Sequence, residues 1–528
     1  MDFDIVSLSR LQFALTALYH FIFVPLTLGL SILVAIMETV YVLTGRTLWR
    51  DMTKFWGGLF GINFAMGVAT GIVMEFQFGM NWSYYSHYVG DIFGAPLALE
   101  GLMAFFLEAT FVGLFFFGWE RLSRVKHLIV AWCVALGSNF SALWILIANG
   151  WMQNPVGAQF NPQTMRMEMT DFFAVLINPM AQTKFVHTVT AGYVTAAVFV
   201  LGISACYLLK GRYPALAKRS MTVAATFGLV SALALVALGD ESGYLVAKHQ
   251  KMKLAAMEAM WKTEPAPAAF TAFGFPDQAA RETHYAVHVP WLMGLIGTRS
   301  LTTEIPGIEA LVEQAERRIR DGLTAYNALQ RIRAASKIGA DIPPQAQADF
   351  ETHGHALGHA LLLKRYTDDP RQASPEQIRQ AAWDTVPQVA PLFWAFRLMV
   401  GLGFFLIVLT AVFSWLSIQR RLDAHRWLLK IAAYSIPLPW IAIECGWIVA
   451  ELGRQPWVIE GVLPTAVAVS NLGASTVLFT IIGFVLIYTV LLLIELKLML
   501  RAIRKGPDIE APDSADSRIT AATPAPAH

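Results

Sequence analysis

The chain has 528 residues, of which 55% are hydrophobic and only 15% charged, and its net charge is +2. Soluble proteins usually carry about 25% charged residues, so this composition excludes an ordinary soluble domain and indicates a membrane protein. The small net charge gives no support for a nucleic acid partner. Cys133, Cys206 and Cys445 all lie in apolar stretches, which predicts no disulfide framework, no Cys-based haem attachment and no iron–sulfur cluster.

Nine apolar stretches are long enough to cross a bilayer, because a spanning helix needs about 20 mostly apolar residues. The first lacks a basic start and is too long for a cleavable signal peptide, so we interpret it as an anchor. We therefore predict an all-α polytopic membrane bundle of nine transmembrane helices. The predicted spans cover about 15–43, 55–77, 94–118, 128–150, 184–209, 219–243, 388–416, 428–451 and 470–499.

The charges of the connecting loops predict the orientation of these spans. The loops after the first, third, fifth and seventh spans are rich in Lys and Arg, as is the end of the ninth, whereas the short loops between them carry one such residue or none. Basic residues are retained in cytoplasmic loops. The alternation therefore places the N-terminus in the periplasm and the C-terminus in the cytoplasm.

The segment 245–387 is polar, helical in pattern and far longer than the other loops. The alternation on either side of it predicts a small extracytoplasmic helical domain. The chain then divides into a six-span bundle at 1–244, this domain at 245–387, three further spans at 388–500 and a disordered cytoplasmic tail at 501–528.

Ionisable and metal-binding side chains gather at one depth of the predicted bundle. His20, His187, Met399, Glu100 and Glu451 all fall in the outer third of their spans. Placing ionisable side chains inside a bilayer costs free energy, so each of these residues is a candidate functional residue. His and Met are axial haem ligands. Taken singly, Met is more often a packing residue, a membrane His can bond a neighbouring helix, and a carboxylate can be an ion or proton site.

Two pairs of carboxylates have spacings of functional interest. Glu444 and Glu451 are seven residues apart, which predicts a shared helix face, whereas Glu100 and Glu108 are eight apart and about 80° round the axis. Carboxylates at successive depths suit proton relay, with Glu108 nearer the cytoplasm. The alternative is a protonated Glu that holds a neighbouring helix by one hydrogen bond.

Several motifs resemble subunit I of the cytochrome bd ubiquinol oxidases, in the form with a long quinol loop. The resemblance extends over all nine spans and the outer domain. The motifs are the run from Ser9 to His20, Met74-Glu-Phe-Gln-Phe-Gly79, Gly94-Ala-Pro-Leu-Ala-Leu-Glu100, Lys184-Phe-Val-His187 and Gly446-Trp-Ile-Val-Ala-Glu451-Leu-Gly-Arg454-Gln-Pro-Trp457.

The resemblance implies two haem b groups and one haem d. It implies that His187 and Met399 are the axial ligands of a low-spin haem b, and that His20 and Glu451 each serve one of two high-spin haems. Which of the two is haem d stays open. Glu100 would lie beside this pair, where oxygen is reduced.

The resemblance also implies a substrate, partners and a location. Lys253 and Glu258 match positions tied to quinol oxidation, and Arg397 and Arg454 are interpreted as partners of haem propionates or of carboxylates. Ubiquinol would be oxidised at the outer face and O2 reduced to water with cytoplasmic protons, which builds membrane potential without a pump. The expected partners are a second large membrane subunit, a small single-span subunit and lipid, in the bacterial inner membrane.

Three other readings compete with this one. A proton-coupled secondary transporter would also hold carboxylates at depth, but it leaves His20, His187 and Met399 unexplained, and no internal repeat is evident. A haem–copper oxidase needs more intramembrane His residues than these two. A haem-bearing anchoring subunit without oxygen chemistry remains open.

Overall fold

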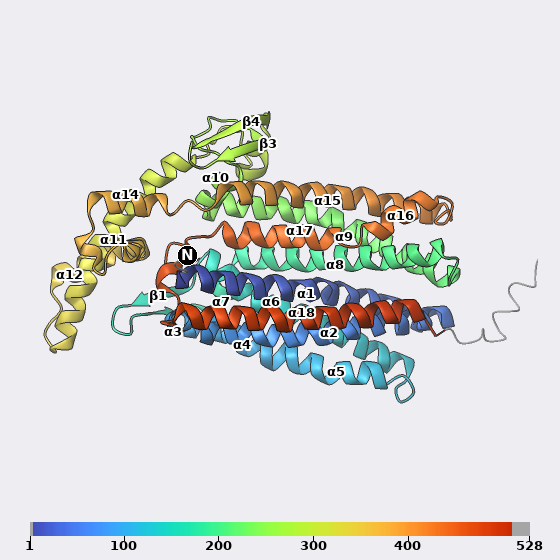
Figure 1. Cartoon of the computed structure of the whole chain (residues 1–528). Coiled ribbons are helices and arrows are strands. Elements are labelled where there is room, and N and C mark those ends of the chain that lie inside the picture. Colours follow the sequence, from blue (N-terminus) through green and yellow to red (C-terminus); the bar gives the residue numbers. More distant parts are fainter. Residues whose placement is uncertain (1–3, 509–528) are drawn as a thin grey trace, which may run out of the picture.

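The computed structural model describes residues 4–508 of the chain, and within them nine helices are long and apolar enough to cross a membrane. They lie side by side in one bundle (Figure 1). The spans are α1 (Ile5–Thr44), α2 (Thr47–Met80), α4–α5 (Gly90–Phe117), α6 (Arg124–Gln153), α7–α8 (Phe172–Leu209), α9 (Pro214–His249), α15 (Val389–Ile418), α16–α17 (Arg426–Leu452) and α18 (Ala474–Lys505). The prediction of nine spans is confirmed.

Local signals in the sequence fix the helix ends. Asp4 caps α1 by accepting hydrogen bonds from the backbone N–H groups of Val6 and Ser7, and Gly45 ends the helix with φ of 69°, a conformation that suits glycine. Asn178 caps α8, and Pro179 occupies its first turn, where no backbone donor is lost.

The centre of the bundle is built on close packing of α1 against α8. A Cβ atom at Gly29 would lie 2.3 Å from the backbone oxygen of Gly192, so the two backbones touch there. Small residues allow this approach between membrane helices. Of the nine spans in the described residues, α8 has the most buried hydrophobic window, at 78%. It packs against α1, α6, α9, α16 and α17 and therefore lies inside the bundle.

A second region lies at one end of the bundle, which we call the domain end (Figure 1). It contains α10 (Lys251–Met257), the hairpin of β3 (Phe270–Asp277) and β4 (Glu282–Val289), η2 (Gly294–Thr298), α11 (Ile308–Lys337), α12 (Pro344–His353), α13 (Leu357–Leu361) and α14 (Pro375–Trp383). The domain end also carries α3 (Ser83–Tyr88), the hairpin of β1 (Ala158–Asn161) and β2 (Arg166–Met169), and the short pair β5 (Trp457–Ile459) and β6 (Leu463–Pro464).

Three details differ from the sequence prediction. The predicted helical domain contains the β3–β4 hairpin, whose alternation of exposed aromatic residues was not recognised. Helix α9 continues to His249, beyond the predicted boundary at 244. Helix α18 continues to Lys505, so residues 501–505 are helical rather than part of a disordered tail, and residues 509–528 of that predicted tail lie outside the described residues.

Candidate functional site

Helix α6 contacts four of the predicted functional residues in order along its length. A Cβ atom at Gly137 would lie 2.9 Å from Cγ of Glu108. Further along, Ser141 Oγ donates to Glu100 Oε1 at 2.8 Å, Asn149 Nδ2 donates to Glu451 Oε1 at 3.1 Å, and Gln153 Oε1 accepts from Lys253 Nζ at 3.1 Å. Residue 153 lies 16 positions after residue 137, a rise of about 24 Å along the helix. Residues far apart in the sequence thus form one series that ends at the domain end.

A π-helical segment brings Glu100 and Glu108 onto one face. In an unbroken α-helix, eight residues turn about 80° beyond two full turns. Residues Glu100–Phe105 form the π-helix η1, in which each turn holds more residues and each residue therefore turns less. The pair comes closer to two whole turns, and both side chains contact α6, Glu108 at Gly137 and Glu100 at Ser141. The predicted offset of about 80° is therefore wrong.

A second π-helical segment separates the side chains of the other carboxylate pair, Glu444 and Glu451. Residues Ile448–Leu452 form the π-helix η6, which turns Glu451 away from the face it would share with Glu444 in an α-helix. Glu451 faces α6 and α8, whereas both carboxyl oxygens of Glu444 are buried and without a hydrogen-bond partner within residues 4–508. The predicted shared face does not hold.

Glu451 lies in a cluster of positive groups. Its Oε1 accepts from Lys184 Nζ at 3.4 Å, and its Oε2 accepts from Nη2 of Arg454. Lys184 also donates to Asn149 and lies 4.9 Å from the Trp447 ring centroid. Nε and Nη1 of Arg454 are buried and make no hydrogen bond in the described part of the chain. Each carboxyl oxygen can accept two hydrogen bonds, so Glu451 can still bind one further group. The Arg454 guanidinium beside it has two nitrogens free to donate.

His20 is held in one orientation by Thr70 of α2. Thr70 Oγ1 lies 2.8 Å from Nδ1 of His20 and also 2.9 Å from the carbonyl oxygen of Met66. The hydroxyl hydrogen is directed to that carbonyl, so the hydroxyl oxygen accepts the hydrogen of Nδ1. Nε2 then carries the free lone pair. This is the tautomer that a haem ligand requires, and the hydrogen bond from Nδ1 to Thr70 sets it.

His187 and Met399 stand across a ring of four helices. Helix α8 contacts α9, α9 contacts α15, α15 contacts α17, and α17 contacts α8. His187 belongs to α8 and Met399 to α15, diagonally opposite each other. Nδ1 of His187 is buried and has no partner among residues 4–508, so the protein's own hydrogen bonds do not engage that nitrogen.

Glycines lie beside each of these three side chains. A Cβ atom at Gly71 would lie 3.3 Å from Cε1 of His20, one at Gly239 would lie 3.8 Å from Cε1 of His187, and one at Gly446 would lie 3.2 Å from Sδ of Met399. A larger residue at Gly71 or Gly446 would crowd the ring of His20 or the sulfur of Met399, whereas Gly239 leaves ordinary contact distance to His187. A flat cofactor approaching these atoms needs that space, so the residues present fit haem ligation.

The two predicted quinol residues are buried in different surroundings. Lys253 donates to Gln250 Oε1 at 2.8 Å, and Gln250 in turn donates to Glu460 Oε2 at 3.2 Å. Glu258 Oε2 accepts from Nη2 of Arg397 at 2.9 Å. Burial lowers the pKa of Lys253 to about 7, aided by the charge of Lys184, and burial raises the pKa of Glu258 to about 7 despite Arg397. Both groups therefore change charge near neutral pH.

Lys253 lines a cavity at the domain end, of about 260 Å³. Arg318, His359, Arg454 and Glu460 also line it, and the cavity lies between α10, α11 and the segment that follows η6. Its volume is near the lower limit of small-molecule sites, about 300 Å³. Burial lowers the pKa of His359 to about 3 and raises that of Glu460. The cavity suits a small polar ring rather than a whole lipid.

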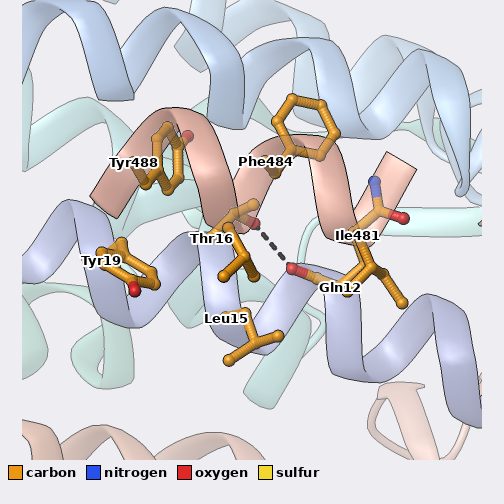
Figure 2. Close-up of a pocket in the computed structure, with 8 residues that line it drawn as sticks. Gln12, Leu15, Thr16, Tyr19, Ile481, Phe484 and Tyr488 are labelled. Atoms are coloured by element: carbon orange, nitrogen blue, oxygen red, sulfur yellow. Dashed lines mark hydrogen bonds between the residues drawn. The ribbon is translucent and has the colours of Figure 1, made fainter. Parts of the chain in front are cut away.

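Figure 2 shows a second gap, between α1 and α18, which is packing rather than a site. Thr16, Tyr19 and Tyr488 line it, and its interior does not admit a water molecule. Gln12 Oε1 accepts from Thr480 Oγ1 at 2.9 Å across it. Tyr488 of α18 also contacts α2, because its hydroxyl donates to the backbone oxygen of Thr70 at 3.2 Å.

Sequence reasoning missed the side chains that support these groups. Thr, Ser, Asn and Gln residues in apolar helices carry no distinctive signal, because only the fold reveals which one faces a ligand. The missed partners are Thr70, Ser141, Asn149, Gln153, Gln250 and Glu460. Lys184 belongs to a quoted motif, but its contact with Glu451 was not predicted.

Comparison with known proteins decides the family. The family model for cytochrome bd terminal oxidase subunit I matches residues 8–507. The chain belongs to this family. It is 52% identical over 504 residues to cytochrome bd-II ubiquinol oxidase subunit 1 of Escherichia coli, covering 96% of this chain and 97% of that one. It is 37% identical to cytochrome bd ubiquinol oxidase subunit 1 of Bacillus subtilis, covering 95% and 94%.

A solved structure supports the same assignment. The bd oxidase of Geobacillus thermodenitrificans superposes with a TM-score of 0.76 at 26% identity, covering 96% of this chain and 99% of that one. The chain is thus the catalytic subunit I of a cytochrome bd quinol oxidase, a multi-pass membrane protein of the respiratory chain that binds haem. The alternative of a proton-coupled transporter is excluded.

Proposed function

We propose that this subunit oxidises ubiquinol beside the domain end and reduces O2 to water with protons from the opposite end of the bundle. The observation that carries the proposal is the series along α6, which joins Glu108, Glu100, Glu451 and Lys253 by direct contacts. Ubiquinol is the substrate named for the relative that is 52% identical.

The residues present support two haem b groups and one haem d as the cofactors. His187 and Met399 would hold the low-spin haem b, His20 would hold one high-spin haem, and Glu451 would hold the other. When bound, the haems supply one-electron transfer and the place where O2 is reduced. Arg454, whose Nε and Nη1 are buried without a partner among residues 4–508, would bind the acidic groups of a haem as well as Glu451.

Protons for oxygen reduction would travel from Glu108 to Glu100. Ser138 follows Gly137, which contacts Glu108, and Ser141 donates to Glu100. These two serines are three residues apart on α6, so they stand on one side of it. Both carboxyls and both hydroxyls can exchange protons, whereas the apolar side chains around them cannot.

The charge of the loops supports the orientation. The basic connections, for example Lys210–Arg219 between α8 and α9, lie at the end opposite the domain end (Figure 1). Positive loops remain in the cytoplasm. We therefore place the N-terminus and the domain in the periplasm and the C-terminus in the cytoplasm of a bacterial inner membrane. Uptake of protons from one side and release on the other would build membrane potential without a pump.

Lys253 and Glu258 would take part in quinol oxidation. A quinol must release two protons as it gives up two electrons, and each of these residues can accept one when its pKa is near 7. Arg397 holds Glu258 in place. The segment 245–387 would thus act as the quinol loop.

The partners would be a second large membrane subunit and a small single-span subunit. The name of the 52% identical relative, a subunit 1, supports the first. The flanks of α4–α5 and α18 expose many apolar side chains that lipid or another subunit would cover, including Phe106, Phe117, Phe479 and Leu486.

The Glu108→Gln variant tests the proton route, because Gln keeps the size and hydrogen bonding but cannot pass on a proton. We expect O2 uptake with ubiquinol to fall at least tenfold, while reduction of the low-spin haem stays fast and haem content is unchanged. The matched control is Glu495→Gln, another buried carboxyl in a span, on α18. Normal turnover in Glu108→Gln with full haem content would contradict the route.

A further inference from the structure

The β3–β4 hairpin exposes an apolar face. Phe273, Phe275, Tyr285 and Val287 are 43%, 50%, 84% and 56% exposed. Side chains two residues apart on a strand share a face, so Phe273 and Phe275 stand together on β3. The pairing shifts register at Tyr285, which has φ of 53°, so its place on this face follows from its contacts and not from alternation. Phe273 pairs with Val287 across the strands, and the rings of Phe275 and Tyr285 lie 6.5 Å apart. We call these four residues the hairpin face.

The opposite face of the hairpin is packed against the protein by polar groups. Thr283 Oγ1 accepts from the indole N–H of Trp261 at 3.1 Å and donates to the backbone oxygen of Ala259 at 3.3 Å. Thr271 is buried, and its backbone oxygen accepts from Arg397 Nε at 2.9 Å. An antiparallel sheet usually turns its apolar face inward and its polar face outward. This hairpin does the reverse.

The hairpin lies beside a membrane span rather than beyond its end. Arg397, which binds the backbone of Thr271, is eight residues into α15, about 12 Å along its axis. The rings of Phe270 and Phe396 lie 6.4 Å apart at the same level. Figure 1 shows β3 and β4 alongside the first turns of α15, at the flank of the bundle. The hairpin therefore stands at the depth where α15 leaves the bilayer.

The hairpin face continues into the lipid-facing side of α15. The ring of Trp394 lies 5.3 Å from that of Phe273 and 5.8 Å from that of Phe275. Trp394, Leu398 and Phe405 are all exposed and are spaced four and seven residues apart, so they form one stripe of the helix. Aromatic residues, Trp above all, prefer the interface between headgroups and acyl chains.

We propose that the hairpin face is embedded in the bilayer leaflet at the domain end, at the boundary of headgroups and acyl chains. Its occupant is lipid, because the face is continuous with a stripe that a membrane span must turn toward lipid. The hairpin thus attaches the domain to the membrane surface as a monotopic element, in addition to the two helices, α9 and α15, that connect it to the bundle. This inference does not depend on the proposed electron or proton route.

Fluorescence quenching in lipid nanodiscs tests the proposal with the complete oxidase complex. Tyr285→Cys and Val287→Cys each receive a fluorophore on the hairpin face. Ser336→Cys, an exposed position near the end of α11, is a first control outside the hairpin. Ala348→Cys on α12, far from the bundle, is the aqueous control. The unsubstituted complex is labelled in parallel, since Cys133, Cys206 and Cys445 are present.

Nitroxides attached to lipid near the headgroup should quench the Tyr285→Cys and Val287→Cys labels several-fold more than the two control labels. Aqueous iodide should show the opposite order. Equal quenching by iodide at Tyr285→Cys and Ala348→Cys would overturn the proposal, because the face would be in water. Weak quenching by both agents at Tyr285→Cys and Val287→Cys would also overturn it, because a protein partner would then cover the face. Unchanged haem absorbance verifies that each variant is folded.

Discussion

Replacement of Thr70 by Val tests the ligand role of His20 without touching His20. Val keeps the shape of Thr but lacks the hydroxyl, so Nδ1 of His20 loses its partner at 2.8 Å. The backbone oxygen of Thr70 still accepts from Tyr488. Thr70 is fully buried, so no bulk water replaces the lost acceptor. The imidazole is then free to rotate or to change tautomer.

The expected loss follows from the cost of a buried, unpaired donor, about 1–3 kcal/mol. At about 1.4 kcal/mol for each factor of ten, haem at His20 should bind about 5- to 150-fold more weakly. This agrees with the 10- to 100-fold effect that is usual when the hydrogen-bond partner of a metal-bound His is removed, about 1.4–2.8 kcal/mol. The assay is titration of haem loss from the purified complex, followed by its absorbance.

Two matched variants make the result interpretable. Thr70→Ser keeps the hydroxyl and should bind haem normally. Thr489→Val removes a hydroxyl that bonds Tyr19 at 3.0 Å on another helix pair, and it should leave haem binding unchanged. If Thr70→Val holds haem as tightly as Thr70→Ser, the hydrogen bond does not orient an iron ligand and the role of His20 must be abandoned.

Three further predictions concern the other candidate residues. Met399→Leu keeps the volume but removes the sulfur, so the low-spin haem should turn high-spin or be lost; an unchanged low-spin spectrum would end the assignment of Met399. Quinol oxidation should become faster as pH rises through about 7, because Lys253 then becomes a neutral amine and Glu258 a carboxylate, and both can accept protons. Stopped-flow reduction measures this rate. A rate that falls over this pH range would contradict the role of the two residues. Glu258→Gln should slow quinol oxidation at least tenfold with haem content intact, and haem loss with normal kinetics would mark Glu258 as structural.

Much of the fold followed from the sequence because the bilayer imposes strict lengths and compositions on its helices. All nine predicted spans correspond to the spanning helices of the described residues. The β3–β4 hairpin was missed because its apolar residues alternate over only eight positions within a polar segment. The ends of α9 and α18 were placed too early, since polar last turns of a helix continue beyond the apolar stretch.

The candidate site was less accessible to sequence reasoning. Motifs named His20, Glu100 and Glu451, but angles derived from 3.6 residues per turn failed at both π-helical segments, which carry no clear signal in the sequence. The support that Thr70 gives to His20 comes from a residue 50 positions away. Such contacts are set by packing of whole helices, and only the three-dimensional structure reveals them.

The most direct measurement is quinol-driven oxygen uptake by the purified complex, combined with quantitative haem extraction. The account predicts two haem b groups and one haem d for each copy of this subunit, a reduced-minus-oxidised spectrum with one low-spin component, and O2 uptake on addition of ubiquinol. A complex that contains haem but consumes no O2 with any quinol, or a colourless one, would contradict the account.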